Sequence, residues 1–137
     1  MLNKIFGRAA AWGPLFLRVA VGVVFVVHGA QKLFGAFGGP GLQNFSGMMT
    51  QMGLRPAMAW ATAVALVEFV GGIMLVLGFM TRLPALLIGV VMAVAVIFVH
   101  LPNGFFIRDG GIEFTLVLLA ACICLLLTGG GRAAMRE

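Results

Sequence analysis

The sequence predicts an all-α integral membrane protein: a four-helix bundle with a short interfacial helix between spans one and two. Two observations carry this prediction. Of the 137 residues, 62% are apolar and only 9% are charged, whereas an ordinary soluble domain has about 25% charged residues. The apolar residues also gather in long stretches. This composition excludes a soluble globular enzyme, a disordered chain and a nucleic-acid-binding module, and it makes the lipid bilayer the expected surroundings.

The predicted spans cover residues 14–34, 57–79, 83–101 and 111–128. Each is long enough, or nearly so, to cross a hydrocarbon core of about 30 Å at about 1.5 Å per helical residue. Pro14 suits the first turn of span one, where its missing N–H costs nothing. Thr81 suits the N-cap of span three, Pro102 its end, and Gly129 the end of span four. We expect a single domain, residues 1–137, because no linker or repeat is visible.

The loop between spans one and two is the long one. Its first part, residues 35–41, is rich in glycine and contains a proline, so it must form a turn. Apolar residues then recur at helical spacing, and polar residues occupy the positions between them. The apolar set is Leu42, Phe45, Met48, Met49 and Met52. This pattern predicts a short amphipathic helix that lies in the membrane interface.

Small residues on span two predict close packing against another helix. Ala57, Ala61 and Ala65 recur at every fourth position, and Gly71 and Gly72 extend the same kind of surface. Helices in lipid approach each other closely where their side chains are small, because no hydrophobic effect drives them together there. We therefore expect a neighbouring helix to lie against this part of span two.

Basic residues in the short loops predict the orientation of the chain. The side that carries both termini holds Lys4, Arg8, Arg82, Arg132 and Arg136. The opposite side holds Lys32, Arg55 and Arg108. Because Lys and Arg in short loops favour the cytoplasmic side, we expect both termini in the cytoplasm.

Costly polar side chains within or beside the spans are where a function is expected. They are Arg18, His28, Gln31, Lys32, Glu68, His100 and Glu113. A charge at the middle of a span costs about 2.5–3.5 kcal/mol on insertion scales, so it needs a partner or a function. His28 and Lys32 lie one turn apart on one helix face. In the predicted orientation, five of these residues lie at membrane depths that allow them to line one pocket, which opens toward the outer side of the membrane. The five are His28, Lys32, Glu68, His100 and Glu113.

Structural explanations remain open for several of these residues. Lys32 can extend to the interface, Glu113 can complement the positive end of span four, and His100 can hydrogen-bond a carbonyl at the end of span three. We expect Arg18 to extend toward the cytoplasmic head groups.

Glu68 is the hardest of the set to explain structurally, because a carboxylate at mid-span needs a partner or a proton. A structural pair with Lys32 or His28 is one answer. Proton transfer is the other, since histidine and a buried carboxylate both suit it. A quinone fits this setting: it dissolves in the membrane, accepts hydrogen bonds at its carbonyls and needs protons when it is reduced.

The leading hypothesis is therefore a quinone-linked redox protein that works with a partner redox subunit or within a larger membrane complex. The expected catalytic residues are His28, Lys32, Glu68, His100 and Glu113. The expected quinone-binding residues are His28, His100 and Asn103. Glu68 is the buried acid or base, Lys32 balances its charge, and Glu113 stands at the mouth of the pocket. The two histidines hydrogen-bond the quinone or relay protons.

Other cofactors find little support in the sequence. There is no Cys-x-x-Cys pair, dinucleotide fingerprint or c-type haem motif, so electrons must come from a partner or a bound substrate. The two histidines with Glu68 and Glu113 contain the donors of a metal site, but no short His spacing supports one, and no metal is predicted. Two other classes stay open: a structural or assembly subunit of a larger membrane complex, and a small transporter or channel oligomer.

An ordered set of motifs runs through most of the chain. It comprises Leu17-Arg18, Gly22, Phe25, His28-Gly29, Lys32-Leu33-Phe34, Glu68 with Gly71-Gly72, Gly78 with Thr81-Arg82, Met92, His100, Gly104-Phe105-Phe106, and Gly111 with Glu113. This set resembles the DoxX family of small bacterial membrane proteins. The end of the chain departs from the family, because Gly129-Gly130-Gly131-Arg132 replaces its usual Gly-Pro-Gly-like turn.

The resemblance implies a four-helix protein of the bacterial inner (cytoplasmic) membrane. Relatives in the family include a membrane subunit of a thiosulfate:quinone oxidoreductase, and others are linked to quinones or to oxidative stress. The resemblance thus implies the same redox class as the polar residues do.

Overall fold

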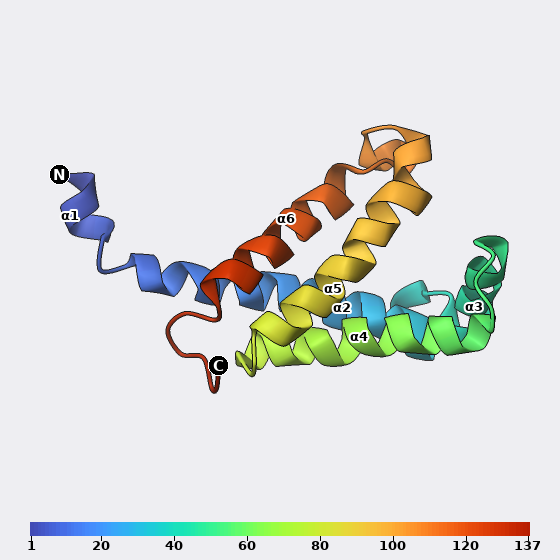
Figure 1. Cartoon of the computed structure of the whole chain (residues 1–137), viewed down its shortest axis with the longest axis horizontal. Coiled ribbons are helices and arrows are strands. Elements are labelled where there is room, and N and C mark those ends of the chain that lie inside the picture. The colour runs from blue at the N-terminus through green and yellow to red at the C-terminus, as the bar shows by residue number, and fades with distance from the viewer.

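Two antiparallel helix pairs make up the protein (Figure 1). The computed structural model describes residues 1–137. The first pair is α2 (Gly13–Phe34) and α4 (Ala57–Leu77), and the second is α5 (Arg82–Val94) and α6 (Glu113–Thr128). The second pair diverges from the first toward the loop that joins α5 to α6 (Figure 1). The structure contains no β-strand, so the predicted all-α class is confirmed.

Shorter helical elements complete the chain. They are α1 (Leu2–Phe6), α3 (Gly41–Gln51), a π-helical segment (Ala95–His100) and 3-10 turns at Ala10–Trp12, Ala36–Gly38, Leu101–Asn103 and Ile107–Asp109. The π-helical segment extends α5 up to Pro102. Because proline cannot donate a hydrogen bond to the preceding turn, the helix changes its bonding pattern where it approaches this residue.

The ends of the helices follow local backbone chemistry. Pro14 lies in the first turn of α2, as predicted, and α2 ends where Gly35 takes a φ of 67°. The second span was predicted to run to residue 79, but α4 ends at Leu77 because Gly78 takes a φ of 71°. Glycine enters this left-handed region without a steric cost, so it ends a helix readily. The fourth helix begins at Glu113, two residues later than predicted.

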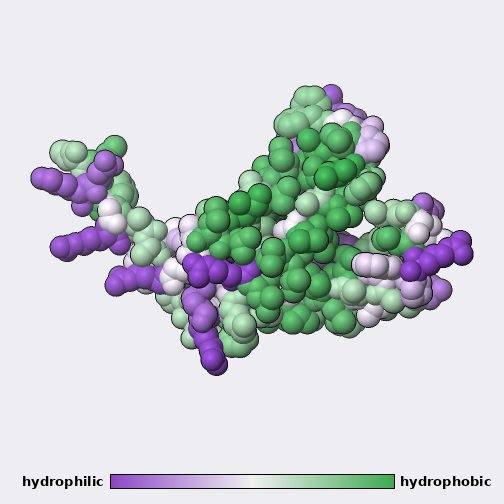
Figure 2. All heavy atoms as spheres, viewed as in Figure 1, coloured by the Kyte–Doolittle hydropathy of each residue, from purple (hydrophilic) through white to green (hydrophobic).

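Three helical segments are long and apolar enough to cross a membrane: Ala10–Phe34, Ala57–Leu77 and Arg82–Asn103. The fourth helix is apolar but has 16 residues, or about 24 Å of helix against a core of about 30 Å. Its crossing as span four stays a prediction. Apolar residues cover the sides of the helices, and charged residues gather at their ends (Figure 2). Such a surface suits lipid contact.

The two termini lie at one end of the bundle (Figure 1). We call this the terminal end (residues 10–18, 75–84 and 126–137). There, Arg132 N–H donates to the Ala11 carbonyl at 2.9 Å, and Met135 N–H donates to the Gly78 carbonyl at 3.0 Å. The segment after α6 therefore folds back over the ends of three helices. The opposite end, with α3 and the α5–α6 loop, is called the loop end.

The predicted interfacial helix exists as α3, and it packs on α4. Phe45 and Met49 of α3 are buried against Ala61 of α4. Ala61 and Ala65 are both fully buried, which confirms the packing role predicted for small residues on span two. The amphipathic pattern thus identified both the helix and its buried face.

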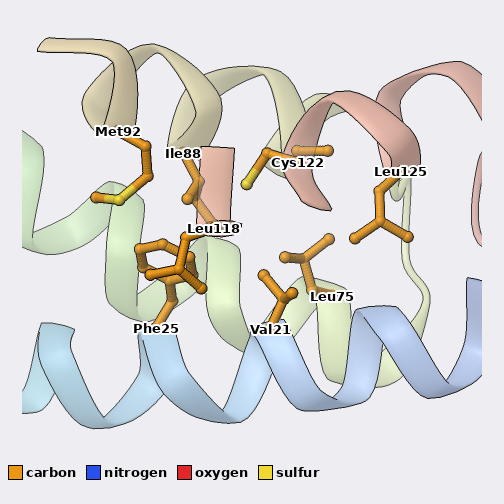
Figure 3. Close-up of a cluster of buried hydrophobic side chains, with 9 residues drawn as sticks. Val21, Phe25, Leu75, Ile88, Met92, Leu118, Cys122 and Leu125 are labelled. Atoms are coloured by element: carbon orange, nitrogen blue, oxygen red, sulfur yellow. The ribbon is translucent and has the colours of Figure 1, made fainter. Parts of the chain in front are cut away.

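One apolar core joins all four long helices. Figure 3 shows Val21 and Phe25 of α2 meeting Leu75 of α4, Ile88 and Met92 of α5, and Leu118, Cys122 and Leu125 of α6. In lipid, this core is stabilised by close packing more than by the removal of apolar surface from water.

Glycines bring α2 and α4 into backbone contact. A Cβ atom placed on Gly29 would lie 2.6 Å from Phe69 Cα, and one placed on Gly22 would lie 2.7 Å from the Gly72 carbonyl oxygen. No side chain fits at either position without moving a helix. This close approach sets the distance across which polar side chains of α2 and α4 must interact.

Candidate functional site

A buried ion pair joins the two closest helices. Lys32 Nζ of α2 lies 2.5 Å from Glu68 Oε2 of α4. The Glu68 side chain is 2% exposed, and that of Lys32 is 19% exposed. Removing either partner would leave an isolated charge in a medium that solvates it poorly. The pairing of Glu68 with Lys32, one of the two pairs expected from the sequence, is confirmed.

The amphipathic helix α3 places an aromatic ring beside this pair. Lys32 Nζ lies 5.3 Å from the centroid of the buried Phe45 ring. A lysine ammonium at this distance from a ring is attracted to its negative face. The turn formed by residues 35–41 leads into α3, which packs on α4 and so brings Phe45 beside the ion pair.

His28 lies one helical turn before Lys32 and is half-buried. Its ring faces α6, where the Phe114 ring lies 6.4 Å away between centroids. Neither ring nitrogen has a hydrogen-bond partner within the chain. His28 therefore keeps a free donor and a free acceptor at the same helix face as the ion pair.

His100 and Asn103 organise the loop between α5 and α6. His100 Nδ1 lies 2.7 Å from the Gly110 carbonyl oxygen. Asn103 Nδ2 donates to the carbonyls of Val99 and Gly110, each at 3.4 Å. The hydrogen bond from the His100 ring to a carbonyl, expected as its structural explanation, is therefore present.

Glu113 also forms hydrogen bonds within the loop between α5 and α6. Its Oε2 accepts a hydrogen bond from Ile107 N–H at 2.9 Å, and its own N–H donates to the Phe105 carbonyl at 2.9 Å. No hydrogen bond or ion pair joins it, His100 or Asn103 to the Lys32–Glu68 pair. The direct contacts of these residues thus form two separate sets, and the single pocket expected for His28, Lys32, Glu68, His100 and Glu113 stays a prediction.

The division has a simple cause. The helix pairs diverge toward the loop end (Figure 1), where His100 and Glu113 form their hydrogen bonds with the α5–α6 loop. The chain also gathers no group of three or more His, Cys, Asp or Glu residues that could hold a metal ion. The catalytic and quinone-binding roles of His100, Asn103 and Glu113 stay predictions.

Arg18 does not extend to the head groups, and that expectation is wrong. The side chain is 1% exposed. Its guanidinium donates to the carbonyls of Leu75 at 3.0 Å, Val76 at 2.6 Å, Gly130 at 3.1 Å and Ala133 at 2.8 Å. The sequence contained one indication that Arg18 binds helix-end carbonyls. Gly78 and Gly129 mark the ends of two helices, and the predicted topology places both ends at the same membrane depth as Arg18.

Comparison with known proteins identifies the family. Residues 13–101 match the family model for DoxX. The chain belongs to the DoxX family. The match to DoxX runs from α2 to the turn after α5, so it includes Arg18, His28, Lys32, Glu68 and His100.

Two curated proteins are similar to this DoxX protein over most of its length. One, from Bacillus subtilis (strain 168), bears the name "Putative oxidoreductase CatD"; it is 36% identical over 117 residues, which are 85% of this chain and 79% of the relative. The other is an uncharacterized protein of Haemophilus influenzae, 29% identical over 123 residues, or 88% of this chain and 85% of the relative. No solved structure matches the chain.

Proposed function

We propose that this DoxX protein is a quinone-linked redox protein, or the quinone-binding subunit of a redox complex. Its site is formed by His28, Lys32 and Glu68. One observation carries the proposal: a Lys32–Glu68 ion pair between two helices lies beside a half-buried histidine whose ring has no hydrogen-bond partner. Groups of this kind are costly in a membrane and usually serve an ion, proton or ligand.

The residues present fit a quinone head group. A quinone carbonyl accepts hydrogen bonds, and His28 has a free ring N–H to donate. Lys32 is partly exposed and uses one of its three N–H groups on Glu68. The Phe45 ring lies beside Lys32 and the Phe114 ring lies beside His28, and both offer flat apolar contacts. A lipid-soluble ligand can reach such a site from within the bilayer.

A bound quinone supplies two-electron chemistry coupled to two protons. Glu68 is placed to hold and deliver a proton at its carboxylate oxygens, and Lys32 keeps the charge of the pair balanced. His28 orients a carbonyl by hydrogen bonding and can donate a second proton. The electrons come from a partner subunit or a bound reductant. The oxidoreductase name of the Bacillus relative supports the same class of reaction.

The test is to extract the protein gently with its native lipids and to measure bound quinone by mass spectrometry. We expect quinone on the parent chain and about tenfold less on His28→Ala, which loses a hydrogen bond of about 1.4 kcal/mol to the quinone. We also expect less on Glu68→Gln, because it removes the ion pair that positions Lys32. Asp109→Asn, an exposed site at the loop end, is the control and should retain the quinone. If the two folded and inserted site variants keep full quinone binding and quinone-dependent activity, the assignment is wrong.

A second function is favoured by the position of the ion pair itself. Lys32 and Glu68 connect α2 to α4, so the pair also stabilises the bundle. In this alternative, the pair has only a structural role and the protein is a structural or assembly subunit of a larger membrane complex. This alternative predicts a quinone-free chain that always co-purifies with one larger complex in fixed stoichiometry. A transporter or channel would instead produce flux in liposomes that contain the purified chain.

A further inference from the structure

The terminal end of the bundle contains a second polar cluster, separate from the proposed quinone site. We propose that it is an oxyanion site, occupied here by the Glu137 carboxylate and able to bind the phosphate of an anionic phospholipid when that side chain leaves. The site is built from the first turn of α5, from Gly130 in the segment after α6, and from the side chains of Thr81 and Arg82.

The first part of the site is the start of α5. The amide N–H groups of Thr81 and Arg82 donate to no backbone carbonyl, and Pro84, in the same turn, has none to donate. Free N–H groups and the positive end of the helix dipole favour an anion here. The guanidinium of Arg82 stays at this end, where Nε donates to the Leu126 carbonyl at 3.1 Å.

The second part is an unused hydroxyl. Thr81 is fully buried, and its Oγ1 is the only buried side-chain oxygen or nitrogen without a hydrogen-bond partner. We expected Thr81 to cap α5, but its side chain makes no capping hydrogen bond. A buried hydroxyl without a partner is destabilising, so its presence here indicates that an acceptor belongs in the space that it faces.

Glu137 shows where that acceptor lies. Gly130 N–H donates to Glu137 Oε1 at 2.7 Å. A Cβ atom placed on Gly130 would meet both Glu137 Oε1 and, at 2.5 Å, Thr81 Oγ1. The Thr81 hydroxyl therefore faces the place where the carboxylate is held. Arg82 Nη2 and Glu137 Oε2 likewise flank Gly129, at 3.5 and 3.2 Å from its Cβ position.

The charges at this end exceed what Glu137 can balance. Arg18, Arg82, Arg132 and Arg136 all belong to the terminal end, whose one acidic side chain is that of Glu137, and none of them forms an ion pair with it. A carboxylate has two oxygens and leaves the Thr81 hydroxyl unused, whereas a phosphate offers more acceptors and carries its charge at the same place. The site lies at the end of α4, the start of α5 and the end of α6, and Arg82 is exposed. Helix ends of a membrane bundle are expected near the phospholipid phosphates.

The experiment compares lipid binding by the full chain and by Glu137→Gln. The purified, delipidated proteins are mixed with phosphatidylglycerol, with a phosphate-free galactosyl diacylglycerol, or with inorganic phosphate, and retained ligand is counted by native mass spectrometry. We expect Glu137→Gln to retain about fivefold more phosphatidylglycerol, since one competing charge near the surface has gone. Retention of the galactolipid should not change. If Glu137→Gln gains inorganic phosphate but no phosphatidylglycerol, the same site is supported, with a free phosphate ion as its ligand.

Matched variants separate this site from general charge effects. In the Glu137→Gln background, Thr81→Val and Arg82→Gln should each remove the gain. Thr81→Val preserves the shape of the side chain, so it should melt no lower than its parent without phosphate ligands. Asp109→Asn removes one carboxylate at the loop end and should leave retention unchanged. The proposal is overturned if Glu137→Gln gains neither ligand, if Thr81→Val keeps the gain, or if Asp109→Asn produces it too.

Discussion

Arg18 shows how one charged side chain can organise a membrane protein without meeting an opposite charge. Its four acceptors are carbonyls at the C-terminal end of α4 and in the segment after α6. The carbonyl end of a helix carries partial negative charge, so a cation is stabilised there. The Leu75 carbonyl also accepts from Gly78 N–H at 3.2 Å, so Arg18 supplies it with a second donor in the last turn of α4. Arg18 thus connects α2, α4 and the final segment in one network.

Replacing Arg18 by lysine should therefore be strongly destabilising. Arg18→Lys preserves the charge but cannot reach four carbonyls with a planar fork of N–H groups. We expect the free energy of unfolding to fall by about 3 kcal/mol, because several charge-assisted hydrogen bonds are lost in a buried place. Denaturation of the protein in detergent micelles, followed by circular dichroism, measures this loss.

The control for this prediction is Arg55→Lys. Arg55 is exposed, and no hydrogen bond or ion pair involves its side chain. A change within about 0.5 kcal/mol is expected for such a surface substitution. Equal stability of Arg18→Lys and Arg55→Lys would show that the carbonyl network contributes nothing.

At the scale of elements, the α2–α4 contact decides where the polar residues meet. Gly22, Gly29 and Gly72 let the two backbones touch, which places Lys32 within reach of Glu68. A wider separation would leave both charges without a partner. The packing of small residues and the ion pair therefore depend on each other.

A methyl group at Gly29 tests this dependence. Because its Cβ would lie 2.6 Å from the Phe69 Cα atom, Gly29→Ala must push α2 away from α4. We expect a loss of roughly 1–3 kcal/mol in the free energy of unfolding, as for other overpacked contacts. Thermal unfolding in micelles provides the measurement.

Gly47 provides the matched substitution. It lies in α3, and nothing lies within 4 Å of its Cβ position. Gly47→Ala should therefore stabilise the protein by about 0.5–1 kcal/mol, the usual gain in helix propensity. A Gly29→Ala protein that melts as high as Gly47→Ala would contradict the close contact.

At the scale of the whole molecule, the two ends of the bundle carry different chemistry. The terminal end holds Arg18, Arg82 and the segment after α6, whereas the loop end holds α3 and the loop organised by His100. The proposed quinone site lies toward the loop end, since Lys32 is in the last turn of α2. The predicted topology places that end on the outer side of the membrane.

Cysteine labelling tests this topology. In a background with Cys122→Ala and Cys124→Ala, single cysteines at the exposed positions Ala9 and Ala133 should react with a membrane-impermeant thiol reagent only from the cytoplasmic side. Cysteines at Asn44 and Asp109, at the loop end, should react only from outside. Labelling of Ala9→Cys and Ala133→Cys from opposite sides would contradict the shared terminal end.

Much of this protein could be predicted from its sequence, because lipid imposes strong local rules. Apolar stretches, proline at a helix start and glycine at helix ends predicted the long helices, and helical spacing predicted α3. The cost of a mid-span carboxylate identified Glu68 as a residue in need of a partner. These inferences depend on neighbours along the chain, so no tertiary information was required.

Only the tertiary structure decided which polar groups meet. The sequence allowed Glu68 to pair with Lys32 or His28, and the glycine contact between α2 and α4 brings Lys32 to it. His100 and Glu113 form their hydrogen bonds within the α5–α6 loop, and the folding back of residues 129–137 supplies two of the carbonyls that bind Arg18. Helix crossing and the path of a loop depend on contacts between distant residues, and the local pattern of a sequence does not contain them.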